Sequence, residues 1–196
     1  LIFFGAGSET IVNLSMSSLI KKLGMDLNLY NSKWAPCWII NFPMFETNSD
    51  GELTPLHHPF TLPKCNSDEL KNNPDTSLAY AYDVVLNGYE IGGGSLRIFD
   101  KSMQETVFET LKISKEEATN KFGFLLKALS SGCPPHGGIA FGLDRIVMLV
   151  TDTTNIRDVI AFPKTQSAAC LLTEAPSKVD EKQLEELKII STHKEE

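Results

Sequence analysis

The stretch NGYEIGGGSLRI, residues 87–98, combines an acid, three consecutive glycines and an arginine in a segment that otherwise has the composition of a strand. Glycine weakens a strand, because it loses much conformational freedom on folding and has no side chain to pack. Three in a row therefore indicate that something approaches this backbone closely. A fixed guanidinium beside bare backbone, here Arg97, suits a small carboxylate, which it can bind through two parallel hydrogen bonds. A surface arginine next to a flexible stretch is the alternative.

Two carboxylates are predicted to lie side by side in the same segment. An Asn-Gly pair at 87–88 between two strand-like runs favours a two-residue type I′ hairpin, which places Asp83 opposite Gly92. Asp83 and Glu90 would then share a face of the sheet. Neighbouring carboxylates repel unless a cation is near, and Mg²⁺, bound by one or two carboxylates and by substrate phosphates, suits this arrangement. A solvated acidic edge fits the pattern equally well.

The position of Arg97 relative to Glu90 requires an irregular strand. The two are seven residues apart, so a regular strand would place them on opposite faces. We predict a β-bulge within Gly92–Gly94, because one extra residue would bring Arg97 to the face of Glu90. The glycines lack the G-x-G-x-x-G spacing of a phosphate loop.

Two further segments contain residues suited to anionic ligands. His57 and His58, in LHHPFT, are suited to bind a metal or to donate hydrogen bonds to an anion when a loop closes, but the residues alone favour loop histidines without a role. In GGIAFGLDRIVMLV, residues 137–150, glycines leave a strand bare for a flat aromatic ring, and Asp144 and Arg145 begin an apolar helix. An arginine at the start of an apolar helix needs a negatively charged partner. That partner is either an anionic ligand or, locally, the carboxylate of Asp144.

The elements that position these residues are predicted from periodicity and capping signals. Strands interleaved with helices and joined by a hairpin favour an antiparallel sheet with helices packed against it, which is an α+β fold. Helices are expected over 8–23 (ended by Gly24), from Ser102, from Ser114, after Gly142 and over 180–189, and strands over 37–45, on both sides of the turn at 87–88 and over 137–141.

Composition narrows the class of protein. The 196 residues are 42% apolar and 22% charged, as in ordinary globular proteins, and the opening LIFF is too short for a signal peptide or a membrane span. We interpret the start as a cut inside a longer protein. The net charge of −7 argues against a general electrostatic grip on nucleic acid. The cysteines, which lack zinc spacing and are expected to be free thiols, are Cys37, Cys65, Cys133 and Cys170.

Together the segments resemble the bacterial-type aspartyl-tRNA synthetases, a family of class II aminoacyl-tRNA synthetases. GGIAFGLDRIVML is similar to their motif 3, which holds ATP, and WIINFPMFE, LHHPFT, AYDVVLNGYEIGGGSLRI, FGFLLKAL, PPHGG and IRDVIAFPKTQSA stand in the family's order. The resemblance covers about residues 34–189. It implies that residues 1–30 are the end of an inserted domain and that residues 31–196 are the C-terminal part of the class II catalytic domain, an antiparallel sheet flanked by helices.

The resemblance also implies a reaction and the residues that serve it. L-aspartate would be activated with ATP and Mg²⁺ to aspartyl-adenylate, and the aspartyl group would pass to tRNA(Asp). Arg97 would bind the side-chain carboxylate of aspartate, with His57 and His58 over the amino acid in a mobile loop. The remaining implied roles are Mg²⁺ binding by Glu90 and Asp83, ATP binding by Glu90, Gly142, Leu143, Asp144 and Arg145, and catalysis by Arg145 at the adenine and γ-phosphate end.

Parts of the family are missing from these residues. Motif 1, motif 2 and the anticodon-binding barrel precede the inserted domain in the family, so we expect the isolated chain to be inactive. A parent protein would be a cytoplasmic homodimer that grips tRNA mainly through those other parts and has no membrane partner. Two alternatives stay open: a synthetase-like protein that binds adenylate without charging tRNA, and a binding module in which the hairpin and the glycine strand are structural only.

Overall fold

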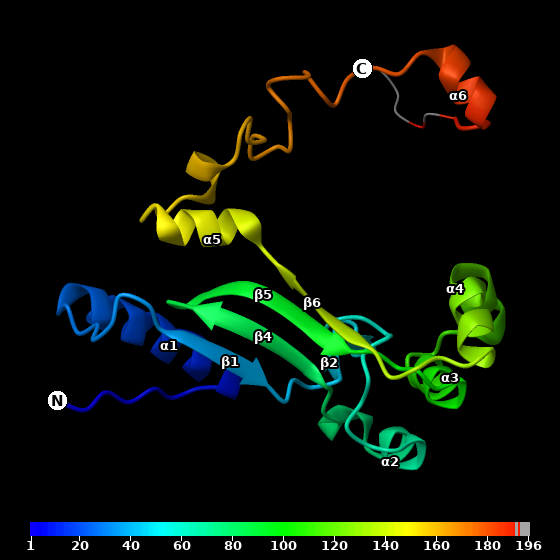
Figure 1. Ribbon diagram of the computed structural model, residues 1–196, viewed down its shortest axis with the longest axis horizontal. Coiled ribbons are helices and arrows are strands. Elements are labelled where there is room, and N and C mark those ends of the chain that lie inside the picture. The colour runs from blue at the N-terminus through cyan, green and yellow to red at the C-terminus, as the bar shows by residue number, and fades with distance from the viewer. Residues whose placement is uncertain (191, 193–196) are drawn as a thin grey trace. The chain divides into compact units, whose positions relative to one another are not determined.

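The computed structural model describes residues 1–190 and 192 of the chain, which forms two compact units, Leu1–Phe141 and Gly142–Glu196. The first unit holds most of the secondary structure (Figure 1). Its elements are α1 (Glu9–Asp26), β1 (Pro36–Ile40), β2 (Phe45–Thr47), β3 (Leu53–Pro55), α2 (Ser67–Asn72), a 3₁₀ turn (Pro74–Thr76), β4 (Ala81–Leu86), β5 (Tyr89–Leu96), α3 (Lys101–Thr110), α4 (Lys115–Ser130) and β6 (Gly137–Phe141).

An antiparallel sheet with strand order β1-β4-β5-β6 forms the centre of the first unit. β2 and β3 make a separate antiparallel pair. The helices α2 and α3 lie at the end of the sheet where β4 begins and β5 ends (Figure 1). The α+β fold expected from the sequence, an antiparallel sheet flanked by helices, is therefore confirmed.

The hydrophobic core lies at that same end of the sheet. It fixes the end of β5 from which Arg97 emerges, because Ile98, the next residue, is only 3% exposed. Phe42, Leu53 and Met103 pack around the core from neighbouring segments. Its buried members are Met44, Phe45, Leu70, Ala79, Ala81, Ile98 and Val107.

The β4–β5 hairpin has the turn that its Asn-Gly pair predicts. Asn87 and Gly88 both have positive φ, 52° and 82°, as a type I′ turn requires. The Asn87 side chain also ties the turn to the segment before β1. Its Oδ1 accepts a hydrogen bond from the Ala35 N–H (2.9 Å), and its Nδ2 donates one to the Lys33 carbonyl (2.9 Å). One side chain thus links the hairpin to the start of β1.

Two predicted boundaries were wrong. α1 does not end at Gly24 but continues to Asp26, and the Tyr30 ring packs against the bare glycine, 3.1 Å from where a Cβ would stand. The single strand predicted over 37–45 is two strands, β1 and β2, because Asn41 between them has a φ of 62°, which interrupts extended backbone.

The helix caps are partly as predicted. Ser114 caps α4 by accepting a hydrogen bond from the Glu117 N–H (3.1 Å). α3 begins earlier than predicted, because the carboxylate of Asp100, and not Ser102, accepts from the Met103 N–H (2.9 Å). The helix α2 was not predicted, although a capping box precedes it.

Among its described residues, the second unit contains two helices and a short turn. They are α5 (Leu143–Val150), a 3₁₀ turn (Ile156–Val159) and α6 (Glu181–Leu187), which lies within the predicted 180–189. Met148 is the buried residue of α5, at 3% exposure. In the part of the chain that the structure describes, no helix has both the length and the apolar character needed to cross a membrane.

Candidate active site

A β-bulge in β5 sets the geometry of the predicted site. Val85 pairs with Glu90, but its neighbour Val84 pairs with Gly92, so Ile91 is one extra residue on β5. The bulge was predicted within the three glycines and lies just before them. The glycines are unsuited to it because all three are paired with β4 on one side and with β6 on the other.

The bulge brings the two carboxylates and the arginine to one face of the sheet. Asp83 pairs with Gly93, and the predicted pairing with Gly92 was wrong by one residue. Because directly paired residues and residues two apart share a face, Asp83, Glu90 and Gly93 point to the same side. Arg97 is four residues beyond Gly93, so it continues this face.

The carboxylates of Asp83 and Glu90 converge above Gly93. A Cβ at position 93 would lie 2.5 Å from Oδ1 of Asp83 and 3.5 Å from Oε1 of Glu90, so a larger residue would displace the Asp83 carboxylate. Burial, and then the negative charge of Glu90, raise the pKa of Asp83 above its ordinary value. Two carboxylates this close repel each other when both are ionised, and a nearby cation would relieve that repulsion.

Arg97 lies against the histidine loop, which we define as residues 57–61. Its Nη1 is 3.0 Å from Nδ1 of His58. A guanidinium can only donate, so Nδ1 accepts and the ring proton is on Nε2. Burial, followed by the charges of Arg97 and His57, lowers the pKa of His58 to about 4, which keeps the imidazole neutral at pH 7.

The guanidinium of Arg97 therefore has a neutral partner. Arg97 is also partly buried, and a charge in that position favours an anionic ligand.

His57 is close enough to Asp83 and to His58 to act on both electrostatically. Its ring meets Phe42 edge to face, with 4.8 Å between the ring centres. The structure thus gathers five of the residues predicted from the sequence, which are His57, His58, Asp83, Glu90 and Arg97.

Two backbone contacts of Arg97 were missed by sequence reasoning. Thr61, at 2% exposure, forms an isolated β-bridge with Arg97, and the Arg97 N–H donates to the His136 carbonyl at 2.9 Å. The loop that contains His136 therefore positions the backbone of the arginine. No local pattern signals these contacts, because each joins segments far apart in the sequence.

The glycines at the β5–β6 pairing fall into two kinds. One glycine of β6 is open on the face of the carboxylates, whereas two glycines of β5 are packed closely against β6. Gly138 pairs with Ser95 and has nothing within 4 Å of where a Cβ would stand, which suits the flat ring predicted for this strand. A Cβ at Gly92 would lie 2.7 Å from Cδ1 of Phe141, and one at Gly94 would overlap the Gly138 carbonyl. These two glycines therefore allow β5 and β6 to pair closely.

The predicted ATP residues Gly142–Arg145 belong to the second unit. Gly142 is the N-cap of α5, and its carbonyl accepts from the Ile146 N–H at 3.1 Å. Leu143, Asp144 and Arg145 form the exposed first turn, and the stem of Arg145 lies 3.7–3.8 Å from where a Cβ at Gly142 would stand. The roles of these four residues remain predictions.

Comparison with known proteins identifies the family. The model of the tRNA synthetases class II (D, K and N) matches residues 9–166, which is most of the chain. The chain belongs to this family. An aspartyl tRNA synthetase from Entamoeba histolytica is similar in structure, with a TM-score of 0.52 and 22% identity over 76% of this chain and 26% of that one. An asparaginyl-tRNA synthetase from the same organism, solved with asparaginyl-adenylate, has the same TM-score and identity over 69% and 26%.

This chain spans about a quarter of each of these class II synthetases. At 22% identity the likeness shows the fold of the class II catalytic core and nothing finer. Because one relative is named for aspartate and the other for asparagine, the amino acid has to be argued from the site itself.

The acidic residues of the first unit fit the magnesium ion that a class II synthetase implies. Mg²⁺ is usually held by one or two carboxylates together with substrate phosphates, and Asp83 and Glu90 supply such a pair over a glycine. Among the described residues, no group of three or more His, Cys, Asp or Glu side chains is placed to bind a metal. A carboxylate pair suits an ion that arrives with phosphate ligands.

All four cysteines are free, as expected.

Proposed function

We propose that this chain is part of an aspartate–tRNA ligase, which activates L-aspartate with ATP and transfers it to tRNA(Asp). The observation that carries the proposal is the guanidinium of Arg97, which is partly buried and donates to a neutral imidazole. The side-chain carboxylate of aspartate would supply a negative charge through two parallel hydrogen bonds. The amide of asparagine offers one acceptor and no charge, so this site favours aspartate.

The remaining roles follow the class II resemblance. His57 and His58 would lie over the bound amino acid, and His58 would hold the arginine ready for it. Asp83 and Glu90 would bind Mg²⁺, which neutralises charge on the phosphates of ATP. The ATP site would comprise Glu90, Gly142, Leu143, Asp144 and Arg145, with Arg145 as the catalytic residue at the adenine and γ-phosphate end.

The activation of aspartate depends on the positioning of the reactants more than on proton transfer. An oxygen of the aspartate α-carboxylate, already an anion, forms a bond to the α-phosphorus of ATP, and the bond from that phosphorus to pyrophosphate breaks. No general base is required, so the contribution of the protein is alignment and charge neutralisation. Arg97 contributes by fixing the far end of the amino acid.

The domain organisation is part of the same proposal. Residues 1–30 would be the end of an inserted domain, and residues 31–196 would be a C-terminal part of the catalytic domain that includes motif 3. The α1 helix lies in the same compact unit as the sheet but contributes no buried residue to it. A homodimer in the cytoplasm, with tRNA gripped mainly by other parts, is the assembly that we infer for the parent.

The test is ATP–pyrophosphate exchange by the full-length protein that contains this sequence, with aspartate, asparagine and lysine supplied separately. We expect exchange with aspartate, and a loss of at least about 100-fold in kcat/KM for Arg97→Ala, since a charge-assisted bidentate pair is removed. Lys22→Ala is the matched control, because it removes a cation that is exposed on α1 and paired with Asp26. Exchange with asparagine alone would refute the proposed substrate.

A protein that forms adenylate but charges no tRNA is the second candidate. The net charge of −7 agrees with this candidate, whereas the first candidate requires that other parts of the protein bind the tRNA. Aminoacylation of tRNA(Asp) by the same full-length protein separates the two: exchange without aminoacylation would establish the second.

A further inference from the structure

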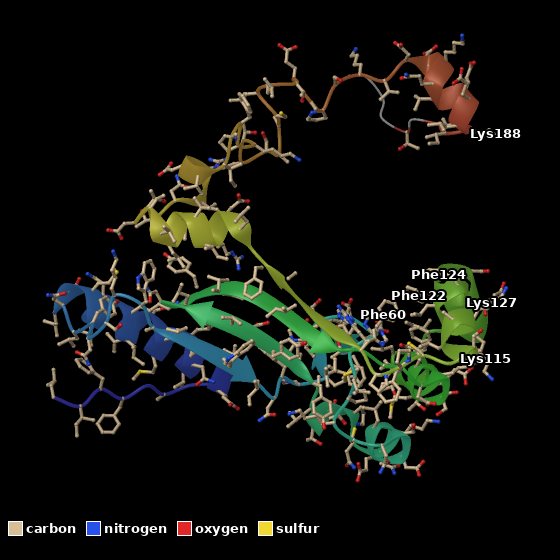
Figure 2. All side chains as sticks on the ribbon, viewed as in Figure 1. Phe60, Lys115, Phe122, Phe124, Lys127 and Lys188 are labelled. Carbon is tan, nitrogen blue, oxygen red and sulfur yellow. The ribbon has the colours of Figure 1, made fainter. Side chains whose placement is uncertain are left out.

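An aromatic cluster supports the histidine loop from behind. The ring of Phe60 meets that of Phe122 edge to face with 5.2 Å between centres, and Phe122 stacks on Phe108 at 5.3 Å with 19° between ring planes. Phe60 also meets Phe108 at 6.4 Å. Phe60 belongs to the loop, whereas Phe108 and Phe122 come from α3 and α4. Figure 2 labels Phe60 and Phe122 together with Phe124, which lies on the same helix and is 78% exposed.

The Phe122 ring comes from a kink in α4. Phe122 has φ −130° and ψ 16°, outside the helical range, whereas the helix continues on both sides. Departing from helical geometry inside a helix is unfavourable, and the glycine that follows, Gly123, makes the adjustment easier. The kink accompanies packing of Phe122 between Phe60 and Phe108, so packing at this point offsets its cost.

Hydrogen bonds fix the same part of the loop. The buried side chain of Gln104 donates from Nε2 to the Pro59 carbonyl at 2.8 Å, and the Ile98 N–H donates to the Phe60 carbonyl at 2.9 Å. The Phe60 N–H in turn donates to Nδ1 of His58 at 3.2 Å. The imidazole that contacts Arg97 is therefore held by a backbone whose position α3 and α4 determine.

We propose that Phe122 is a positioning residue for the amino-acid site. It acts through Phe60 and His58 on the guanidinium of Arg97, although it belongs to a helix outside the sheet. The consequence for substrate binding rests on the proposed function, but the effect on the histidine loop does not. Loss of the Phe122 ring loosens the loop, and Arg97 then loses a fixed orientation before the amino acid binds.

The kinetic test compares Phe122→Leu with Phe124→Leu in the full-length protein. We expect Phe122→Leu to raise the KM for aspartate about tenfold, or about 1.4 kcal/mol, with kcat and the KM for ATP changed by less than about twofold. Phe124→Leu alters an exposed ring of the same helix and should change none of these constants. An unchanged KM for aspartate in Phe122→Leu, or equal changes in kcat and in both KM values, would overturn the proposal.

A second measurement does not depend on activity. Diethyl pyrocarbonate modifies neutral imidazoles, and peptide mass spectrometry gives the rate at each histidine. Phe122→Leu should speed modification of His58 about fivefold relative to exposed His136, and Phe124→Leu should not. An unchanged rate at His58 would overturn the proposed support of the loop. If the wild-type protein shows no exchange with any amino acid, the proposed function fails and this rate alone decides the role of Phe122. Should Phe122→Leu fail to fold, Phe122→Met, which keeps most of the volume, takes its place.

Discussion

The glycine between the two carboxylates gives a sharp test of the metal site. In Gly93→Ala the new methyl group would stand 2.5 Å from Oδ1 of Asp83, whereas a relaxed contact needs about 3.5 Å. The carboxylate of Asp83 must therefore move by about 1 Å from its place above residue 93. The two oxygens that converge above residue 93 would no longer be placed for one ion.

The expected effect on stability is small. Turning the Asp83 side chain away from its preferred rotamer costs about 0.5–1.5 kcal/mol. Alanine reduces the conformational freedom of the unfolded chain, which offsets about 0.4–1 kcal/mol. We therefore expect the free energy of unfolding to change by less than about 1 kcal/mol in urea titrations. The Gly93→Ala variant should therefore stay folded, so its affinity for Mg²⁺ can be measured.

The assay is pyrophosphate exchange by the full-length protein at fixed ATP and varied free Mg²⁺. We expect the half-saturating Mg²⁺ concentration to rise about tenfold in Gly93→Ala, as when a metal ligand loses its alignment. Gly5→Ala is the matched control, because the atoms nearest to its methyl group would belong to the side chains of Val12 and Met16. A half-saturating concentration in Gly93→Ala equal to that of the control would refute the assignment of Asp83 and Glu90 to Mg²⁺.

Three further predictions concern folding. Ser114→Ala removes the cap of α4 and should lower the free energy of unfolding by about 1 kcal/mol in urea, whereas Ser131→Ala, at the other end, should change it by less than half as much. Asn87→Ala removes two hydrogen bonds and places alanine at a φ of 52°, so a loss of about 2–3 kcal/mol is expected; a loss below about 0.5 kcal/mol would contradict that account. The pKa of His58 is lowered from 6.5 in the unfolded chain to about 4 in the folded protein. As the pH drops from about 6.5 to 4, the unfolded chain therefore binds a proton that the folded protein does not, and the free energy of unfolding should fall. Solvent screening of this partly exposed ring limits the loss to about 1–2 kcal/mol, and His58→Gln should abolish that part of the pH dependence.

Local signals in the sequence predicted local structure well. The Asn-Gly pair specifies the turn because few residues other than asparagine and glycine accept positive φ at both positions. Ser114 and Glu117 likewise mark the start of α4 within four residues. α2 was missed although Asn66 and Glu69 form a readable capping box, so that signal was overlooked and was not absent.

Features that depend on pairing between distant segments were predicted less well. The need for a bulge followed from the spacing of Glu90 and Arg97, but its place did not, because pairing of the glycines with β6 decides it. The bridge from Thr61 to Arg97 joins two segments whose approach is set by the core around Ile98. The acid pair and the two histidines were found by residue type, whereas the contacts that orient them come from tertiary structure.

The three glycines of β5 thus have two separate roles, and both roles contribute to the arrangement of the predicted site residues. The outer two let β6 approach the strand, which leaves no unpaired residue within the triplet and moves the bulge to Ile91. That bulge changes the alternation of side chains, so Arg97 joins Glu90 on one face. The middle glycine then leaves room on this face for the carboxylates. In the proposed function, the carboxylates that would hold a cation and the guanidinium that would bind an anion therefore lie along one strand, which is what a reaction between a carboxylate and a nucleotide phosphate requires.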